Sequence, residues 1–196
     1  MMIYTDGRES LIAQLRQFQP WNEQEEKDRV LILRCLENQE DIFLRSNTLA
    51  HMTASAWVLN PDHTHALMAY HNIYHSWSWL GGHADGETDL LAAALREVRE
   101  ESGIRAVRPL MTVPFSVESL TVDGHVKRGA YISSHLHLNV TYLLEADDRE
   151  CLFTKPDENS AVGWFPLDEA VDASCEPWFR EHVYSKLNDK VRRIST

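Results

Sequence analysis

The chain has 196 residues, of which 43% are hydrophobic, and a formal net charge of −11 at pH 7. This length predicts one packed domain with additions, and the charge excludes the basic surface that binding nucleic acid through its phosphates requires. The three cysteines are too far apart for a disulfide framework or a metal site, so we expect reduced thiols in a cytoplasmic protein. No apolar run suits a signal peptide or a membrane span, so no membrane partner is expected.

The first 47 residues are predicted to form a helical N-terminal extension, in front of a domain over residues 48–196. Apolar residues recur at helical spacing over residues 8–18. Asn22, with Glu25 three residues later, resembles a capping box that opens a second helix. A packing or dimerisation role is the simpler interpretation, and it is compatible with a homodimer. A role in covering substrate is the alternative.

The segment after the extension is predicted to consist largely of strands. Residues 51–60 and 65–70 suit a β-hairpin, because turn residues at Asn60-Pro61-Asp62 separate two runs suited to strands. Asp123-Gly124 predicts a second hairpin turn further along the chain. Further strands are expected within residues 110–122, 131–145 and 162–166, and closing helices over residues 167–173 and 177–193.

Three glutamates lie on one predicted helix that follows a glycine-rich loop. The loop begins at Gly81 and Gly82, and the acids Glu97, Glu100 and Glu101 recur at i, i+3 and i+4, which places them close together. Like charges at this spacing destabilise a helix by roughly 0.2–0.5 kcal/mol per pair, whereas a hard divalent cation prefers oxygen ligands. The helix therefore predicts a cation site. A solvated acidic surface is the alternative for the acidic run taken alone.

The same helix also has a predicted apolar stripe and predicted caps that would fix it in the fold. A predicted apolar stripe consists of Leu91, Ala94, Leu95 and Val98. Thr88 or Asp89 is expected to cap the start of the helix, and Gly103 is expected to end it in the left-handed conformation. One side of the helix should thus be fixed in the core while the neighbouring side presents the acids.

The spacing of these residues resembles the Nudix hydrolase motif. The matching residues are Gly82, Arg96, Glu97, Val98, Glu100, Glu101, Gly103 and Ile104. A long motif of fixed spacing is far more specific than a lone glycine motif. One position departs from the family pattern. The loop glutamate that pairs with the arginine in the family should fall at Thr88, and the glutamate in this chain is Glu87.

The resemblance implies an α/β protein with a Nudix-type α/β/α sandwich and a mixed sheet, preceded by the short helical segment. It implies an enzyme that hydrolyses a pyrophosphate bond in a nucleoside diphosphate derivative, such as ADP-ribose or a nucleoside triphosphate. Mg²⁺ or Mn²⁺ would be the cofactor. A catalytically weak module that senses a nucleotide is the alternative from another class, although such modules usually lose the acids that this chain retains.

The resemblance also implies roles for individual residues. The implied metal ligands are Gly81, Glu97, Glu100, Glu101 and Glu158. Arg96 would orient the carboxylates, and Glu97, Glu100 or Glu158 would take the proton of the attacking water. Glu158 is included because it lies on a loop shortly before Trp164, the usual setting of a late acid in the family.

Polar residues on the strand over 131–145 and in the glycine-rich loop are candidate substrate contacts. His135, His137 and Asn139 share one face of the predicted strand, and His83 lies in the loop within reach of a phosphate. Two histidines two apart on a strand also suit a shared zinc ion, but no further ligand is apparent from the sequence. Substrate contact is therefore the favoured interpretation.

Weaker candidates lie elsewhere in the chain. Glu118 and Glu145 compete with Glu158 for the role of the late acid, and Lys127 and Arg128 are candidate phosphate contacts. The downstream motif of Nudix enzymes that act on reduced NAD is absent, as is the upstream signature of those that act on coenzyme A. The sequence therefore points to a substrate class without naming a substrate.

Overall fold

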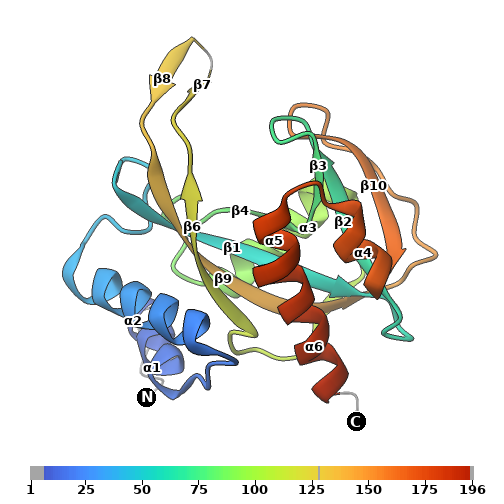
Figure 1. Ribbon diagram of the computed structural model, residues 1–196, viewed down its shortest axis with the longest axis horizontal. Helices are drawn as coiled ribbons and strands as arrows, with labels where there is room; N and C mark the ends of the chain where they lie inside the picture. Colours follow the sequence, from blue (N-terminus) through green and yellow to red (C-terminus); the bar gives the residue numbers. More distant parts are fainter. Residues whose placement is uncertain (1–6, 128, 195–196) are drawn as a thin grey trace.

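The structure of the protein, a computed structural model, describes residues 7–127 and 129–194, except for the side chain of Lys127. An eight-stranded mixed sheet forms the centre of this part of the chain (Figure 1). The strands are β1 (Ala50–Leu59), β2 (His65–His71), β3 (Ser76–Ser78), β4 (Leu80–His83), β5 (Val107–Pro109), β6 (Ser116–Val122), β9 (His135–Ala146) and β10 (Asn159–Pro166). The order is β10-β2-β1-β9-β5, with β3 beside β2, β4 beside β1 and β6 beside β9. β1 and β9 run parallel, and the other pairs are antiparallel.

Helices cover both faces of the sheet, as the α/β/α prediction requires (Figure 1). They are α1 (Gly7–Gln17), α2 (Glu23–Asn38), α3 (Leu90–Ser102), α4 (Leu167–Ala173), α5 (Pro177–Phe179), the π-helical turn η1 (Arg180–Tyr184) and α6 (Ser185–Ile194). None of the helices in the described ranges combines the length and the apolar character that crossing a bilayer requires.

Alternation along β1 explains why the sheet is covered on both sides. Met52 and Ala54 belong to a buried cluster shared with α1, α2 and α3, whereas Trp57 and Leu59 belong to a second cluster shared with α4, η1 and α6. A strand that is buried along its whole length, as β1 is, supplies apolar residues to both faces. The N-terminal helices therefore pack into the same core as the glycine-rich loop and its helix.

Several local predictions are confirmed. α1 lies within one residue of its predicted bounds. Asn22 caps α2, because its Oδ1 accepts a hydrogen bond from the backbone N–H of Glu25 at 2.9 Å. The hairpin of β1 and β2, the closing helix α4 and a strand before it are also present.

The predicted turn at Asp123-Gly124 is wrong. The chain passes through these residues from β6 into β7 (His125–Lys127), and β7 pairs with β8 (Ala130–Ile132). The reversal lies beside Gly129, whose φ of 81° is in the left-handed region that glycine adopts without strain. The long strand predicted over residues 131–145 is consequently broken between β8 and β9. The short β7–β8 ribbon projects from the sheet at the top of Figure 1.

Candidate metal and catalytic site

Helix α3 is held at both ends by the residues predicted to do so. The side chain of Asp89 accepts a hydrogen bond from the N–H of Ala92 at 3.1 Å, and Gly103 closes the helix with a φ of 76°. The apolar stripe differs from the prediction, because Leu91 and Leu95 are only half-buried. The buried residues of α3 are Leu90, Ala93, Ala94, Glu97, Val98, Glu101 and Ser102.

The segment over residues 81–104, which carries the motif, is called the box below. Two of its three acids on α3 therefore point into the protein. Glu97 and Glu101 are 9% and 5% exposed, whereas Glu100 lies on the exposed side of α3. The expectation that the acids occupy a side next to the buried one is thus corrected: Glu97 and Glu101 belong to the buried side itself. They are accommodated there because the glycine backbone of β4 passes directly over them.

The two glycines of β4 make this close approach feasible. The backbone N–H of Gly81 donates a hydrogen bond to Oε2 of Glu101 at 2.9 Å. A Cβ atom added to Gly82 would lie 2.6 Å from Cδ of Glu97, a distance that real Cβ atoms do not tolerate. The two residues together form a cradle for two carboxylates. Gly82 leaves room for Glu97, whereas a Cβ atom at Gly81 would lie 2.6 Å from the carbonyl oxygen of Ala54 on the neighbouring strand β1.

Two cationic side chains link the acids to one another. Arg96 donates from Nη2 to Oε1 of Glu97 at 3.0 Å, and its Nε lies 4.0 Å from Oε1 of Glu100. Lys155 places Nζ 3.0 Å from both Glu100 and Glu158. The structure thus brings Glu158 beside the box through a lysine that the sequence reasoning did not single out.

The site carries more negative charge than its two cations balance. Burial, with further contributions from Glu97 and Glu158, raises the pKa of Glu101 to about 8, although the Gly81 N–H opposes this. Burial also raises the pKa of Glu97, against the effect of Arg96. A divalent cation bound to these carboxylates would favour their ionised forms and so release the proton that burial favours on Glu101.

The donor atoms fit a hard divalent cation. Four carboxylates from Glu97, Glu100, Glu101 and Glu158 face two cationic side chains, so two negative charges stay uncompensated when all four acids are ionised. The donors are oxygens, and Mg²⁺ and Mn²⁺ prefer oxygen ligands. A divalent cation would satisfy both the charge and the chemistry of this site.

Asn159 is a further residue that the sequence reasoning missed. Its Nδ2 donates to the backbone carbonyl of Glu101 at 3.0 Å, and its Oδ1 accepts from the backbone N–H of Lys155 at 3.1 Å. Asn159 therefore ties the loop that carries Lys155 and Glu158 to the end of α3. The only signal for it in the sequence is its place directly after Glu158.

The displaced Glu87 does not replace the loop glutamate of the family pattern. Its Oε1 accepts a hydrogen bond from the backbone N–H of Asp89 at 2.9 Å. Over the residues that the structure describes, no hydrogen bond or ion pair joins Glu87 to Arg96, which instead contacts Glu97 and the His83 carbonyl. The one-residue offset thus leaves Arg96 anchored by the backbone of the glycine-rich loop.

Asn139 lies away from the box acids, in a buried polar network. Its Oδ1 accepts hydrogen bonds from Thr53 and Ser55, and its Nδ2 donates to Glu118 and Thr141. Protein partners thus occupy both ends of the amide, on the face of the sheet opposite α3. Glu118 belongs to the same network and is fully buried, so the structure does not bring it to the box.

The other weak candidates also lie apart from the box. Glu145 accepts hydrogen bonds from Arg108, and its Oε2 lies 3.0 Å from Nε2 of His63. Arg128 and the side chain of Lys127 fall outside the described residues. Among the late acids considered, Glu158 alone joins the carboxylate cluster through an ion-pair partner that it shares with a box acid.

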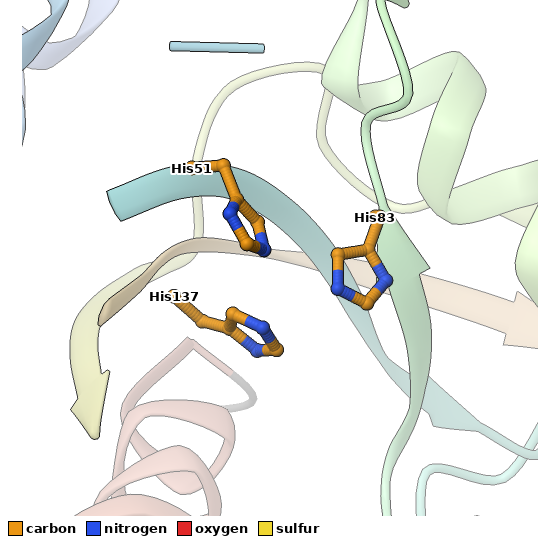
Figure 2. Close-up of side chains that lie close together, drawn as sticks. All are labelled: His51, His83 and His137. Carbon is orange, nitrogen blue, oxygen red and sulfur yellow. The ribbon is translucent and has the colours of Figure 1, made fainter. Parts of the chain in front are cut away.

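The three histidines predicted as substrate contacts lie together, and a fourth joins them. His83 on β4 and His135 and His137 on β9 surround His51 on β1, with ring centroids 4.9–5.1 Å from that of His51. Figure 2 shows the rings of His51, His83 and His137 turned toward one another. Burial, reinforced by the neighbouring histidines, lowers the pKa of His137 to about 2, so this imidazole is neutral at pH 7.

His51 was missed because strand register is not a local property. It is the Cα partner of His137 on the parallel neighbour β9, and nothing in either segment alone specifies that alignment. Two alternating polar residues, His51 and Thr53, at the start of an otherwise apolar strand were the available signal.

Comparison with known proteins agrees with this architecture. A family model described as NUDIX domain matches residues 49–187. A curated protein named RNA pyrophosphohydrolase, from Pelagibacter ubique (strain HTCC1062), is 26% identical over 121 residues, or 60% of this chain and 75% of that protein.

Two solved structures share the fold at a TM-score of 0.53. A NUDIX-family hydrolase from Clostridium perfringens is 17% identical, with 74% of this chain and 97% of that chain covered. The E. coli dihydroneopterin triphosphate pyrophosphohydrolase is 14% identical, with 72% and 95% covered. Since the family model spans well over half of the sequence, the chain belongs to the Nudix hydrolase family.

Proposed function

We propose that this protein hydrolyses a pyrophosphate bond in a nucleoside diphosphate derivative, such as ADP-ribose or a nucleoside triphosphate, with Mg²⁺ or Mn²⁺ as cofactor. The observation that carries the proposal is the pair of buried carboxylates, Glu97 and Glu101, held against Gly81 and Gly82. The name of the Pelagibacter ubique relative, RNA pyrophosphohydrolase, supports the same reaction class.

The proposed metal ligands are Glu97, Glu101, Glu100 and Glu158, together with the carbonyl oxygen of Gly81. A divalent cation held there would neutralise pyrophosphate charge and would lower the pKa of a bound water molecule. Arg96 holds Glu97 through a 3.0 Å hydrogen bond and lies close to Glu100, which keeps these carboxylates directed at the site.

Proton transfer is proposed to involve one of three acids. Glu100 and Glu158 are the more exposed, and Lys155 holds them 3.0 Å from its Nζ. Glu97 is the third candidate and lies deeper. A positioned carboxylate that takes the proton of the attacking water contributes about 10²–10⁴-fold to the rate.

His83, His135 and His137 keep their proposed role as substrate contacts. Asn139 does not, because protein partners occupy both ends of its buried amide. The division into an N-terminal extension over residues 1–47 and a Nudix domain over residues 48–196 is likewise a proposal, supported by a family match that begins at residue 49. A cytoplasmic location, where Cys35, Cys151 and Cys175 stay reduced, completes the proposal; all three are free thiols in the structure.

A substrate panel assayed with and without metal tests this function. The panel comprises ADP-ribose, nucleoside triphosphates, dinucleoside polyphosphates and a 5′-triphosphorylated oligoribonucleotide, and products are separated by ion-exchange chromatography. We expect at least one compound to be cleaved between two phosphorus atoms in Mg²⁺ or Mn²⁺. A chelator should return the rate to the uncatalysed background, and added metal should restore it.

Two outcomes would contradict the proposal. Turnover that persists in excess chelator would exclude the role of the metal. Tight calorimetric binding of ADP-ribose without cleavage in either metal would instead favour the nucleotide-sensing module. Cleavage of the oligoribonucleotide alone would support the proposed reaction but would identify the 5′ end of RNA as the substrate. That result would go against the expectation from the net charge of −11.

A further inference from the structure

The four histidines beside the box are brought together by strands that are distant in sequence. His51 on β1 is the Cα partner of His137 on β9, and His83 on β4 is the partner of Thr53, two residues after His51. Because side chains alternate along a strand, His51 and Thr53 share a face. All these imidazoles therefore project from the face of the sheet opposite α3.

Three of the imidazoles are close enough to share one ion. His51, His83 and His137 each offer a ring nitrogen, and these nitrogens lie within 4.8 Å of one another (Figure 2). Ligands about 2.0–2.1 Å from a tetrahedral Zn²⁺ are separated by about 3.4 Å. Small rotations of the three side chains would close the remaining difference.

The second ring nitrogen of His51 has the kind of partner that is typical of a metal-bound histidine. Nδ1 of His51 lies 3.0 Å from the carbonyl oxygen of Asn47, to which it donates. Backbone carbonyls commonly orient metal-bound imidazoles in this way. The hydrogen bond leaves Nε2 of His51 as the free ring nitrogen of the residue.

That nitrogen supplies an independent observation. His51 is 4% exposed, and its buried Nε2 has no hydrogen-bond partner among the residues that the structure describes. A buried polar atom without a partner is costly, and an ion held among the three rings would give it one. The nearby cation Arg45 is ion-paired with Asp85, so its charge is balanced locally.

We propose that His51, His83 and His137 form a second metal site, for a divalent transition ion of the Zn²⁺ class, separate from the oxygen-lined box. Imidazole nitrogens favour such ions over Mg²⁺. Three protein ligands leave a fourth position. His135 borders that position, because its Nε2 lies 3.2 Å from Nε2 of His137.

The site is joined to the box through β4 but differs from it in chemistry. His83 directly follows Gly82, and its carbonyl accepts a hydrogen bond from Arg96 at 3.2 Å. An ion on the histidines would thus fix the end of the strand whose glycines cradle Glu97 and Glu101. Binding of this ion can be measured without any turnover, so its test is independent of the hydrolytic function.

Metal retention by the tag-free full-length chain tests the proposal. The protein is stripped with chelator, incubated with Zn²⁺ in excess Mg²⁺, desalted and analysed by mass spectrometry for metal content. We expect about one retained Zn²⁺ per chain. Co²⁺ in place of Zn²⁺ should give the strong visible absorption of a tetrahedral nitrogen site.

Matched variants locate the ion. His83→Asn and His137→Asn should each weaken Zn²⁺ binding at least about 100-fold, since loss of even an orienting partner of a ligand costs about 10–100-fold. His135→Asn should have a smaller effect. The half-exposed His182 on η1 is the control, and His182→Asn should retain the ion.

Glu101→Gln separates the two sites. It should retain Zn²⁺ and Co²⁺ absorption, because Glu101 contributes nothing to the histidine cluster. The proposal is overturned if wild type retains no Zn²⁺, or if Glu101→Gln loses the ion while folded His83→Asn and His137→Asn keep it. Circular dichroism of each metal-free variant verifies folding, and His83, at the end of β4, provides a ligand variant less disruptive than the buried His51.

Discussion

Replacing Glu101 by glutamine is expected to lower the rate of pyrophosphate hydrolysis at least about 100-fold, because it removes a proposed metal ligand and loss of even an orienting partner of a ligand costs about 10–100-fold. The Glu101 carboxylate lies beneath Gly81 and is 5% exposed. Glutamine has nearly the same shape and keeps an oxygen that can accept the Gly81 N–H. It removes the negative charge that would hold the metal, so the rate should fall while the fold persists.

The control for this variant is Glu169→Gln, which removes an exposed carboxylate on α4, away from the box. It should match wild type in kcat and KM. Raising the Mg²⁺ concentration should recover part of the lost rate in Glu101→Gln, because the variant binds metal more weakly. Equal rates for wild type and Glu101→Gln at limiting metal would show that the box does not carry the reaction.

Replacing Glu118 by glutamine is expected to destabilise the protein by about 3–5 kcal/mol, the cost of removing one partner from a buried ion pair. Glu118 is fully buried, and Nζ of Lys186 on α6 lies 3.0 Å from its Oε1. The carboxylate also accepts hydrogen bonds from Ser116, Asn139 and Thr141. An amide in its place would leave an ammonium unbalanced and turn a donor toward other donors.

The other buried carboxylate near Lys186 cannot compensate for the loss of Glu118. Glu25 on α2 lies 2.7 Å from Nζ of Lys190 and 3.5 Å from that of Lys186. Burial alone would raise the pKa of Glu25, but the two lysines hold it below its ordinary value. Glu25 is thus already engaged by two cations and cannot replace Glu118 as the partner of Lys186.

Urea unfolding followed by circular dichroism measures the effect of Glu118→Gln. In thermal unfolding, the expected loss of stability corresponds to a fall in Tm of roughly 6–20 °C for a chain of this size. Glu26→Gln, which removes a half-exposed partner of Arg29, should leave the transition close to that of wild type. The double variant Glu118→Leu with Lys186→Met should recover part of the loss. An unchanged midpoint for Glu118→Gln would disprove the energetic role assigned to the network.

The features that the sequence predicted well are those that depend on neighbouring residues. The caps of α3 at Asp89 and Gly103, and the cap of α2 at Asn22, follow from side-chain chemistry within a few positions. The mixed sheet with helices on both faces came from the resemblance of the box to a known family. Glu158 was also placed near the box by that resemblance, although Lys155, the residue that holds it there, carried no signal of its own.

The features that the sequence did not reveal depend on contacts between distant segments. The inward direction of Glu97 and Glu101 depends on how closely the backbone of Gly81 and Gly82 approaches α3. The histidine cluster depends on the register of β1 against β9. Helical periodicity and strand alternation give the faces of an element, but they do not specify which face meets which neighbour.

Hydrolysis in oxygen-18 water tests most directly the claim that the box directs water to a phosphorus atom of a pyrophosphate. Wild-type protein is incubated with the best substrate of the panel and Mg²⁺, and the masses of the products are measured by mass spectrometry. We predict that each turnover places one labelled oxygen in a phosphate group of one product and none in its sugar or base, and that this labelling is absent in Glu101→Gln. Label in a sugar hydroxyl, or equal labelling by Glu101→Gln, would contradict the account.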